Sequence, residues 1–133
     1  MKFADLPKAD LVAIIDAILE TSPALLVGLN RDNEIILWSF SLEKLLGWTA
    51  EEVLGHDLAT VAIPAKEQKT MRRVFEDTIE SNQQYRFSHL LSKNGEEIVV
   101  FGCSTSVHRI NGSLILVIVT GFDISRYRYR KGD

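Results

Sequence analysis

The 133-residue chain carries 15 Lys and Arg against 18 Asp and Glu, a formal net charge of −3 at pH 7. This length suits one domain with one sizeable core, and 46% hydrophobic with 25% charged residues is typical of a soluble globular domain. The acidic balance gives no reason to expect nucleic acid as a partner. The single cysteine excludes an internal disulfide and a multi-cysteine zinc site, and it fits a reducing compartment.

The first element predicted along the chain is an amphipathic helix over residues 8–20. Its apolar residues recur with the spacing of one helix face, at Leu11, Ile14, Ile15, Ile18 and Leu19. The helix must end before Pro23, because a residue that precedes proline is driven out of the helical region. Residues 24–29 and 34–38 are then expected to form two strands of a hairpin, joined by a turn at 31–33.

Capping signals predict two short helices after this hairpin. Ser39 or Ser41 is placed to cap a helix that ends at Gly47, because a helix often ends in a left-handed glycine. Thr49 and Glu52 have the spacing of a capping box, in which each side chain satisfies a free backbone N–H of the first turn.

A longer helix and three strands are expected in the second half of the chain. The helix runs from Pro64 to about Ser81, and its buried stripe consists of Met71, Val74, Phe75 and Thr78 or Ile79. Between residues 88 and 125, three apolar segments are separated by Asn94-Gly95 and Asn111-Gly112, and Asn-Gly pairs are strong hairpin signals. Strands and helices segregated in this order predict an α+β fold with an antiparallel sheet.

Three ordered segments resemble motifs of the PAS family. Residues 45–58 (LLGWTAEEVLGHDL) are similar to its "LFGYT-EE-IGK-L" segment, residues 92–96 (SKNGE) to its "KDG" turn and residues 121–125 (GFDIS) to its closing "DIT". The resemblance spans roughly residues 20–125. It implies a PAS-like fold, in which a five-stranded antiparallel sheet flanked by short helices and one long helix encloses a pocket.

The resemblance also implies a domain organisation and a role. Residues 1–22 would form an N-terminal amphipathic dimerisation helix, residues 23–125 the PAS domain, and residues 126–133 an exit segment toward a missing or removed effector. PAS domains are mostly sensory or dimerising modules of signalling proteins. We therefore expect a cytoplasmic input module of a bacterial or archaeal signalling protein, such as a two-component system whose effector is a histidine kinase.

Catalysis and membrane contact are not expected of this domain. The sequence has no nucleophile elbow, no phosphate-binding glycine loop and no metal-ligand spacing, so neither an enzyme nor a metal site is predicted. The longest strongly apolar run, residues 114–119, has the length of a strand rather than of a membrane span.

The resemblance argues against two cofactors that PAS domains carry. The light-sensing flavin branch needs a cysteine just after the glycine that ends the Glu-Glu helix, where this chain has Gly55-His56-Asp57-Leu58. Gly121 stands where that branch has a flavin-contacting glutamine. The best-known haem-binding branch uses a histidine on the long helix, and residues 64–81 contain none. A small organic ligand, or no ligand, is therefore expected.

The predicted pocket residues come from the long helix and three strands. They are Met71, Phe75, Arg86, Val100, Gly102, Ser104, Val117, Val119 and Gly121. In the last strand, the resemblance places Ile115, Val117, Val119 and Gly121 on the inner face. The two strand glycines either leave volume for a ligand or ease a close backbone contact. Ser104 and Ser106 either offer hydroxyls to a ligand or are satisfied locally.

The pairing of the strand at residues 85–92 is left open between two registers. A two-residue turn pairs His89 with Val100 and places aromatic residues in the pocket. A three-residue turn with a bulge pairs Leu90 with Val100 and places Arg86 and Ser88 there, which would favour an anionic ligand. The two alternatives exchange the faces of the strand, because side chains alternate along it.

The outer face of the sheet predicts a homodimer. Leu116, Ile118 and Phe122 need a cover, and the helix stripe of Leu11, Ile14, Ile15 and Ile18 can supply it on its own sheet or on a neighbour's. The alternative function is a ligand-free protein–protein interaction module. It applies if large side chains fill the space between the long helix and the sheet.

Overall fold

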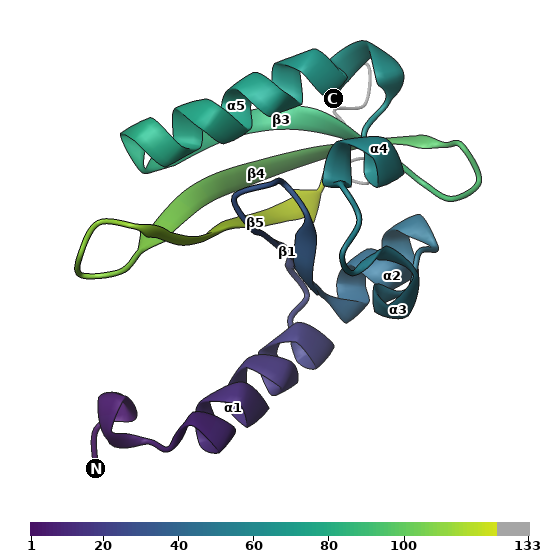
Figure 1. Cartoon of the computed structure of the whole chain (residues 1–133). Coiled ribbons are helices and arrows are strands. Elements are labelled where there is room, and N and C mark those ends of the chain that lie inside the picture. The colour runs from purple at the N-terminus through teal and green to yellow at the C-terminus, as the bar shows by residue number, and fades with distance from the viewer. Residues whose placement is uncertain (125–133) are drawn as a thin grey trace, which may run out of the picture.

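The computed structural model describes residues 1–124 and shows a five-stranded antiparallel sheet with helices on both of its faces (Figure 1). The predicted fold class is therefore confirmed. The strand order is β2-β1-β5-β4-β3, and the strands are β1 (Leu25–Leu29), β2 (Ile35–Trp38), β3 (Gln83–Leu91), β4 (Glu97–His108) and β5 (Leu114–Asp123). The expected exit segment, residues 126–133, lies outside the described residues.

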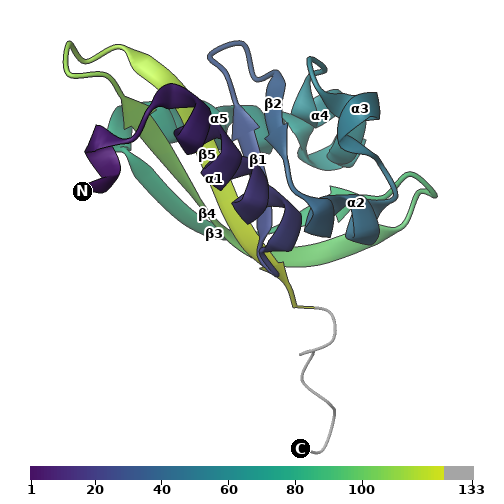
Figure 2. The ribbon, with the colours of Figure 1, turned by 90° about the horizontal axis from the view of Figure 1, so that it is seen from below.

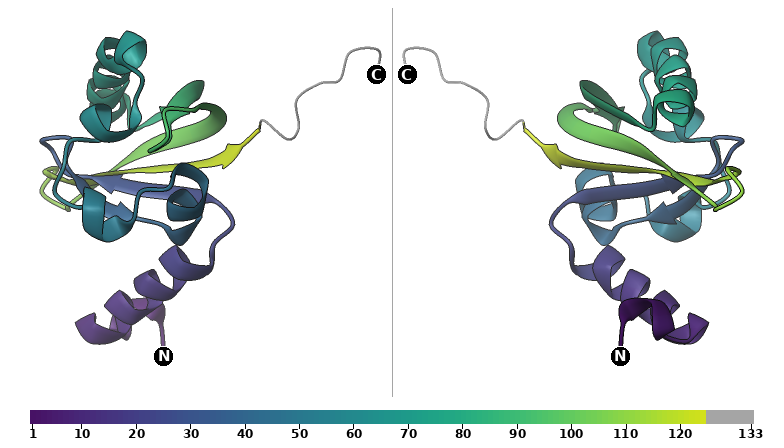
Figure 3. Two further views of the ribbon diagram at one scale, coloured as in Figure 1. Left: turned by 90° about the vertical axis from the view of Figure 1, so that its right-hand side faces the viewer. Right: turned by 90° about the vertical axis from the view of Figure 1, so that its left-hand side faces the viewer.

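The helices divide between the two faces of the sheet. They are α1 (Lys8–Thr21), α2 (Phe40–Leu46), α3 (Ala50–Val53), α4 (Leu58–Ala62) and α5 (Gln68–Ser81), with short 3₁₀ turns at Phe3–Asp5 and Ala65–Glu67. Helix α5 covers one face, whereas α1 lies on the opposite side (Figure 3). Seen from that side, α1 crosses in front of β5 and β1 (Figure 2). Within residues 1–124, every helix is too short or too polar to span a membrane.

Local sequence signals account for the short helices. The Ser39 hydroxyl accepts a hydrogen bond from the Leu42 amide at 3.3 Å, so Ser39 rather than Ser41 caps α2. Gly47 ends that helix in the left-handed region, with φ of 83°. Thr49 and Glu52 form the predicted capping box at the start of α3. These caps fix where the chain turns, and so they position the helices around the sheet.

The long helix begins later than the sequence suggests. Pro64 is followed by the 3₁₀ turn, whose last residue Glu67 has φ of −110° and ψ of 0°, and α5 starts only at Gln68. Helix α4 was not predicted at all. Its signal is Asp57, whose carboxylate accepts a hydrogen bond from the Ala59 amide at 2.8 Å and caps the helix.

Strand β3 pairs with β4 in neither of the two expected registers. Ser88 pairs with Val100, and the strands are joined by the five residues 92–96. This register is shifted by two residues from the alternative that pairs Leu90 with Val100. A shift of two preserves the faces of a strand, so Arg86 shares the face of Val100, as in that alternative.

The Asn-Gly turns are wider than two-residue hairpin turns. Gly95 and Gly112 have φ of 88° and 91°, but among the described non-glycine residues only Asn33 and Asn82 have positive φ. A tight type I′ turn needs positive φ at both central residues. The two hairpins predicted from the Asn-Gly pairs are present, with the glycine alone in the left-handed region.

Candidate functional site

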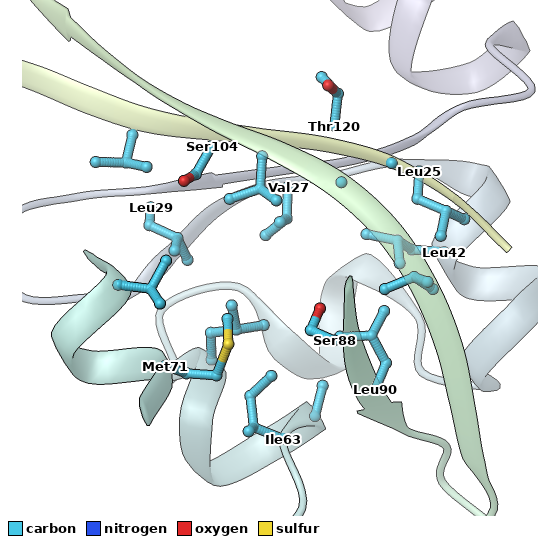
Figure 4. A pocket seen from close by; sticks show the side chains of 18 of the residues that line it. Leu25, Val27, Leu29, Leu42, Ile63, Met71, Ser88, Leu90, Ser104 and Thr120 are labelled. Carbon is cyan, nitrogen blue, oxygen red and sulfur yellow. The ribbon is translucent and has the colours of Figure 1, made fainter. Parts of the chain in front are cut away.

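A cavity of about 90 Å³ lies between the inner face of the sheet and the helices that cover it (Figure 4). Its walls come from β1 to β5 on one side and from α2, α4 and α5 on the other. The structure brings all nine predicted residues to this cavity: Met71, Phe75, Arg86, Val100, Gly102, Ser104, Val117, Val119 and Gly121. That they bind a ligand stays a prediction.

Regular periodicity positions most of these side chains. Met71 and Phe75 are four residues apart on α5, so they lie on the same face of the helix. Phe75 is 8% exposed and belongs to the core. The strand residues alternate at a spacing of two, which directs every second side chain toward the helices. Periodicity therefore gives these residues common faces, and the packing of α5 on the sheet brings them together.

Fourteen further residues line the cavity, and none of them was predicted to do so except Ser88, which one of the two open registers placed there. They are Leu25, Val27, Leu29, Asn33, Trp38, Leu42, Leu46, Leu58, Ala62, Ile63, Val74, Ser88, Leu90 and Thr120. The alternation of Leu25, Val27 and Leu29 along β1 was a usable signal. The lining residues of α4, Leu58 and Ala62, could not be placed at the cavity from the sequence because that helix had not been predicted.

Ile115 does not lie on the inner face, contrary to expectation. It is exposed and is not part of the cavity wall. The pairing of β4 and β5 shifts at this point, since Val107 pairs with Leu116 and His108 with Leu114. Ile115 is thus the extra residue of a β-bulge, and a bulge interrupts the alternation of side chains.

Gly102 and Gly121 serve both of the roles that the sequence left open. They pair with each other across β4 and β5, and both line the cavity. A Cβ atom on Gly102 would lie 2.8 Å from the Thr120 carbonyl oxygen, and one on Gly121 would lie 2.9 Å from the Phe101 carbonyl oxygen. The close backbone approach excludes side chains at both positions, and their absence leaves a bare strip on the cavity wall.

The two strand serines are satisfied by the protein. The Ser104 hydroxyl lies 2.7 Å from the Thr78 hydroxyl, which also donates a hydrogen bond to the Val74 carbonyl at 2.7 Å. Ser106 donates to the Asn82 side-chain oxygen at 3.3 Å. Thr78 is fully buried, so its bond to Ser104 joins α5 to β4 in the interior, at the edge of the cavity.

Among residues 1–124, Arg86 is the one ionisable residue that lines the cavity. Its Nε donates a hydrogen bond to the Phe87 carbonyl oxygen at 3.1 Å. Among residues 1–124, no carboxylate forms an ion pair with its guanidinium, and no group bonds the hydroxyl of nearby Ser88. Both side chains therefore keep hydrogen-bonding capacity at the cavity.

A second cluster of ionisable groups lies at the edge strand, outside the cavity. Glu67, His89 and Glu97 bring three possible metal-ligand atoms within 4.8 Å of one another. Both carboxylates of this cluster already have a protein partner: Glu67 Oε2 lies 2.6 Å from His89 Nδ1, and Glu97 Oε1 lies 3.0 Å from Lys66 Nζ. The arrangement is that of a surface ion-pair network that ties the 3₁₀ turn before α5 to β3 and β4.

One ion pair holds the turn between β3 and β4 against α3. Lys93 Nζ donates to Glu52 Oε2 at 2.6 Å, and the Lys93 amide donates to the Leu46 carbonyl at 2.8 Å. The hydrogen bond from Lys93, together with one from the Thr49 amide, lowers the pKa of the Glu52 carboxyl from 4.5 to about 2. The turn that ends β3 is thus fixed by residues of the helical segment.

Solved structures of several other proteins share this architecture. The PAS domain of a Colwellia psychrerythraea protein has a TM-score of 0.78 at 14% identity, over 88% of this chain and 99% of that one. The Rhodobacter sphaeroides LOV protein gives 0.75 at 13% identity, over 92% and 71%. The N-terminal domain of a diguanylate cyclase with PAS/PAC sensor from Marinobacter aquaeolei gives 0.67 at 19%, over 80% and 99%.

These likenesses show a shared fold. No functionally curated protein matches the chain by sequence. The family model of the PAS fold, however, matches residues 13–124. This span includes both the cavity and the sheet that carries it, and it begins within α1. The chain belongs to the PAS family.

Proposed function

We propose that this chain is a sensory PAS domain that binds a small ligand in the cavity between its sheet and its helices. It acts without catalysis of its own, in the cytoplasm, as the input module of a signalling protein such as a two-component histidine kinase. The ligand state changes the packing of the sheet against the flanking elements, and a ligand does so when it prefers one of two packings. The cavity itself is the observation that carries this proposal.

The composition of the cavity supports ligand binding. Most of its lining side chains are aliphatic, and a few polar groups lie among them, which is the usual composition of a small-molecule pocket. Large side chains from α5 reach the sheet without filling this space. A pure interaction module with a filled core is therefore the less favoured function.

Native mass spectrometry of freshly purified protein, without heating or organic solvent, tests the proposal. We expect a defined additional mass for each subunit. Val119→Phe, which directs a ring into the cavity, should abolish that mass. Ile110→Phe, in the exposed turn between β4 and β5, adds the same ring outside the cavity and should retain it. A wild-type protein without added mass, or equal loading of both variants, would contradict the proposal.

A second proposed activity is homodimerisation through α1 and the outer face of the sheet. None of the α1 residues is buried, and Ile15 and Ile18 are 41% and 45% exposed. On the outer sheet face, Phe87, Phe101 and Phe122 form a row across three strands, and all three are exposed. One copy leaves both surfaces open, and a two-fold pair lets each copy cover the other's.

The same surfaces include the residues predicted to form the interface: Leu11, Ile14, Ile15 and Ile18 on the helix, and Leu116, Ile118 and Phe122 on the sheet. The double substitution Ile15→Asp/Ile18→Asp should produce monomers in size-exclusion chromatography with light scattering. Ala13→Asp/Ala17→Asp adds the same charges to the opposite face of α1 and should leave the dimer intact. A dimer that survives the first pair of substitutions would exclude an interface through this helix.

A further inference from the structure

We infer that the cavity takes a short-chain monocarboxylate, with its carboxylate at Arg86 and its apolar tail between α5 and the sheet. This inference rests on the proposed ligand-binding function and narrows the chemical class of the ligand. It is carried by four features of the cavity wall: the charge of Arg86, the free donors beside it, the bare strip on the sheet, and the size of the apolar space.

The charge on the cavity wall has one sign. Arg86 lines the cavity, and no Asp, Glu, Lys or His of the described part of the chain does. The four ion pairs within residues 1–124 involve Lys66, Arg72, His89 and Lys93, so none of them neutralises Arg86. A positive charge without a protein partner, beside an apolar space, favours an anionic group on the ligand.

The hydrogen-bond donors beside the cavity suit a carboxylate. Only Nε of Arg86 is bonded within the described chain, which leaves the two terminal nitrogens of the guanidinium available. Ser88 lies two residues further on the same face of β3, and its hydroxyl points into the cavity (Figure 4). A planar fork of N–H groups with an adjacent hydroxyl matches the two oxygens of a carboxylate.

The bare strip connects this polar end to the apolar wall. Arg86, Gly102, Gly121 and Leu25 are consecutive partners across β3, β4, β5 and β1. Adjacent strands are about 4.8 Å apart, so two glycines in succession leave a strip along which an alkyl tail can lie. The tail leads from the guanidinium toward the leucine and the side chains of α5.

The volume limits the length of the tail. An engineered apolar cavity of about 150 Å³ accommodates the six carbon atoms of benzene. By the same ratio, the 90 Å³ cavity accommodates roughly three to four carbon atoms. Butyrate and valerate, with three and four carbon atoms beyond the carboxylate, fit this space when the carboxylate lies at the Arg86 side of the cavity.

Amide-detected NMR titration of the full chain at pH 7 tests the inference with butyrate, 1-butanol and butylamine as probes. Charge-assisted hydrogen bonds favour the acid, so butyrate should bind about tenfold more tightly than 1-butanol, and butylamine should bind least. Arg86→Gln should reduce butyrate affinity about tenfold and leave 1-butanol affinity unchanged. Arg73→Gln removes the same charge from an exposed position of α5 and should change neither.

The outcomes separate this inference from the proposed function. If 1-butanol binds in the cavity as tightly as butyrate, or if Arg86→Gln binds butyrate like the wild type, the carboxylate assignment is wrong while ligand binding stands. If neither probe shifts cavity resonances, the carboxylate assignment is wrong, and the ligand-binding function is then decided by the native mass spectrum, where an added mass would uphold it and its absence would contradict it. Arg86→Lys keeps the charge without the fork, and butyrate affinity between those of the wild type and Arg86→Gln would further support the assignment.

Discussion

The hydrogen bond between Thr78 and Ser104 should be a measurable contribution to stability, because it joins α5 to the sheet in the interior. Thr78 is 0% exposed and Ser104 is 9% exposed. The Thr78 hydroxyl donates to the Val74 carbonyl, so in the 2.7 Å bond between the two hydroxyls Ser104 is the donor. Removal of the Thr78 hydroxyl therefore leaves Ser104 without an acceptor, whereas removal of the Ser104 hydroxyl leaves Thr78 with its bond to Val74.

Thr78→Val leaves the Ser104 hydroxyl buried without an acceptor, which costs about 2 kcal/mol within the usual range of roughly 1–3. Ser104→Ala is milder, at about 1 kcal/mol, because Thr78 keeps its bond to Val74. In the double variant no hydroxyl is left unpaired. Its free energy of unfolding should fall by about 2 kcal/mol rather than by the sum of about 3.

Urea unfolding measured by circular dichroism gives these free energies. One protein concentration should be used throughout, since a dimer would make the midpoint concentration-dependent. Ser81→Ala is the matched control: Ser81 also bonds the carbonyl four residues earlier on α5, but it is exposed, and its loss should be within about 0.5 kcal/mol. Strict additivity of the two substitutions would refute the reasoning.

Three further changes test other parts of the structure. The pKa of Glu52 is lowered from 4.5 to about 2, so the stabilisation by its carboxylate is present above pH 4.5 and is lost as the pH falls toward 2. The difference in urea midpoint between the wild type and Glu52→Gln should therefore shrink on acidification. The control variant Glu51→Gln should show no such trend. Phe75→Ala should cost roughly 3 kcal/mol, at the low end for a buried phenylalanine because part of the ring already faces the cavity; a loss above about 5 would mean that no cavity adjoins it. Gly102→Ala should lower the free energy of unfolding by about 1–3 kcal/mol, since its Cβ would meet a backbone oxygen at 2.8 Å; an unchanged midpoint would show that the strands can separate there.

The elements that the sequence predicts well are those with a local physical cause. The cap of α2 at Ser39 and the capping box of α3 need only neighbouring residues, and both are present. The five strands follow from alternation and turn residues. Helix α4 was not predicted because its five residues are too few for helical periodicity to be recognised. Its one local signal was the capping residue Asp57.

The residues that line the candidate site were predictable in part, whereas the bulge at Ile115 and the volume of the cavity were not. Periodicity grouped the residues of α5, β4 and β5 onto common faces. In β5 both faces are apolar, so the resemblance to the PAS family, rather than the pattern, decided which face points inward. The predicted inward orientation of Ile115 was wrong because a bulge inserts one residue into β5 opposite β4. A bulge has no clear signature in a run of Leu, Ile and Val. The volume left between large side chains depends on packing at the scale of a methyl group, which no pattern encodes.

The register of β3 had the largest consequence for function and the weakest local signal. Alternation allows either face of β3 to point inward, and a slip of one residue would replace Arg86 with aromatic neighbours in the cavity. The turn at residues 92–96 decides between them, through the Ser92 amide donating to the Glu96 carbonyl at 2.8 Å and the Gly95 amide donating to the Ser92 carbonyl at 3.0 Å. The bond from the Lys93 amide to Leu46 at the end of α2 holds this turn in place. A contact between residues far apart in the sequence thus supports the register that places Arg86, the one charged residue of the cavity wall within residues 1–124, where it can bind the carboxylate that we propose.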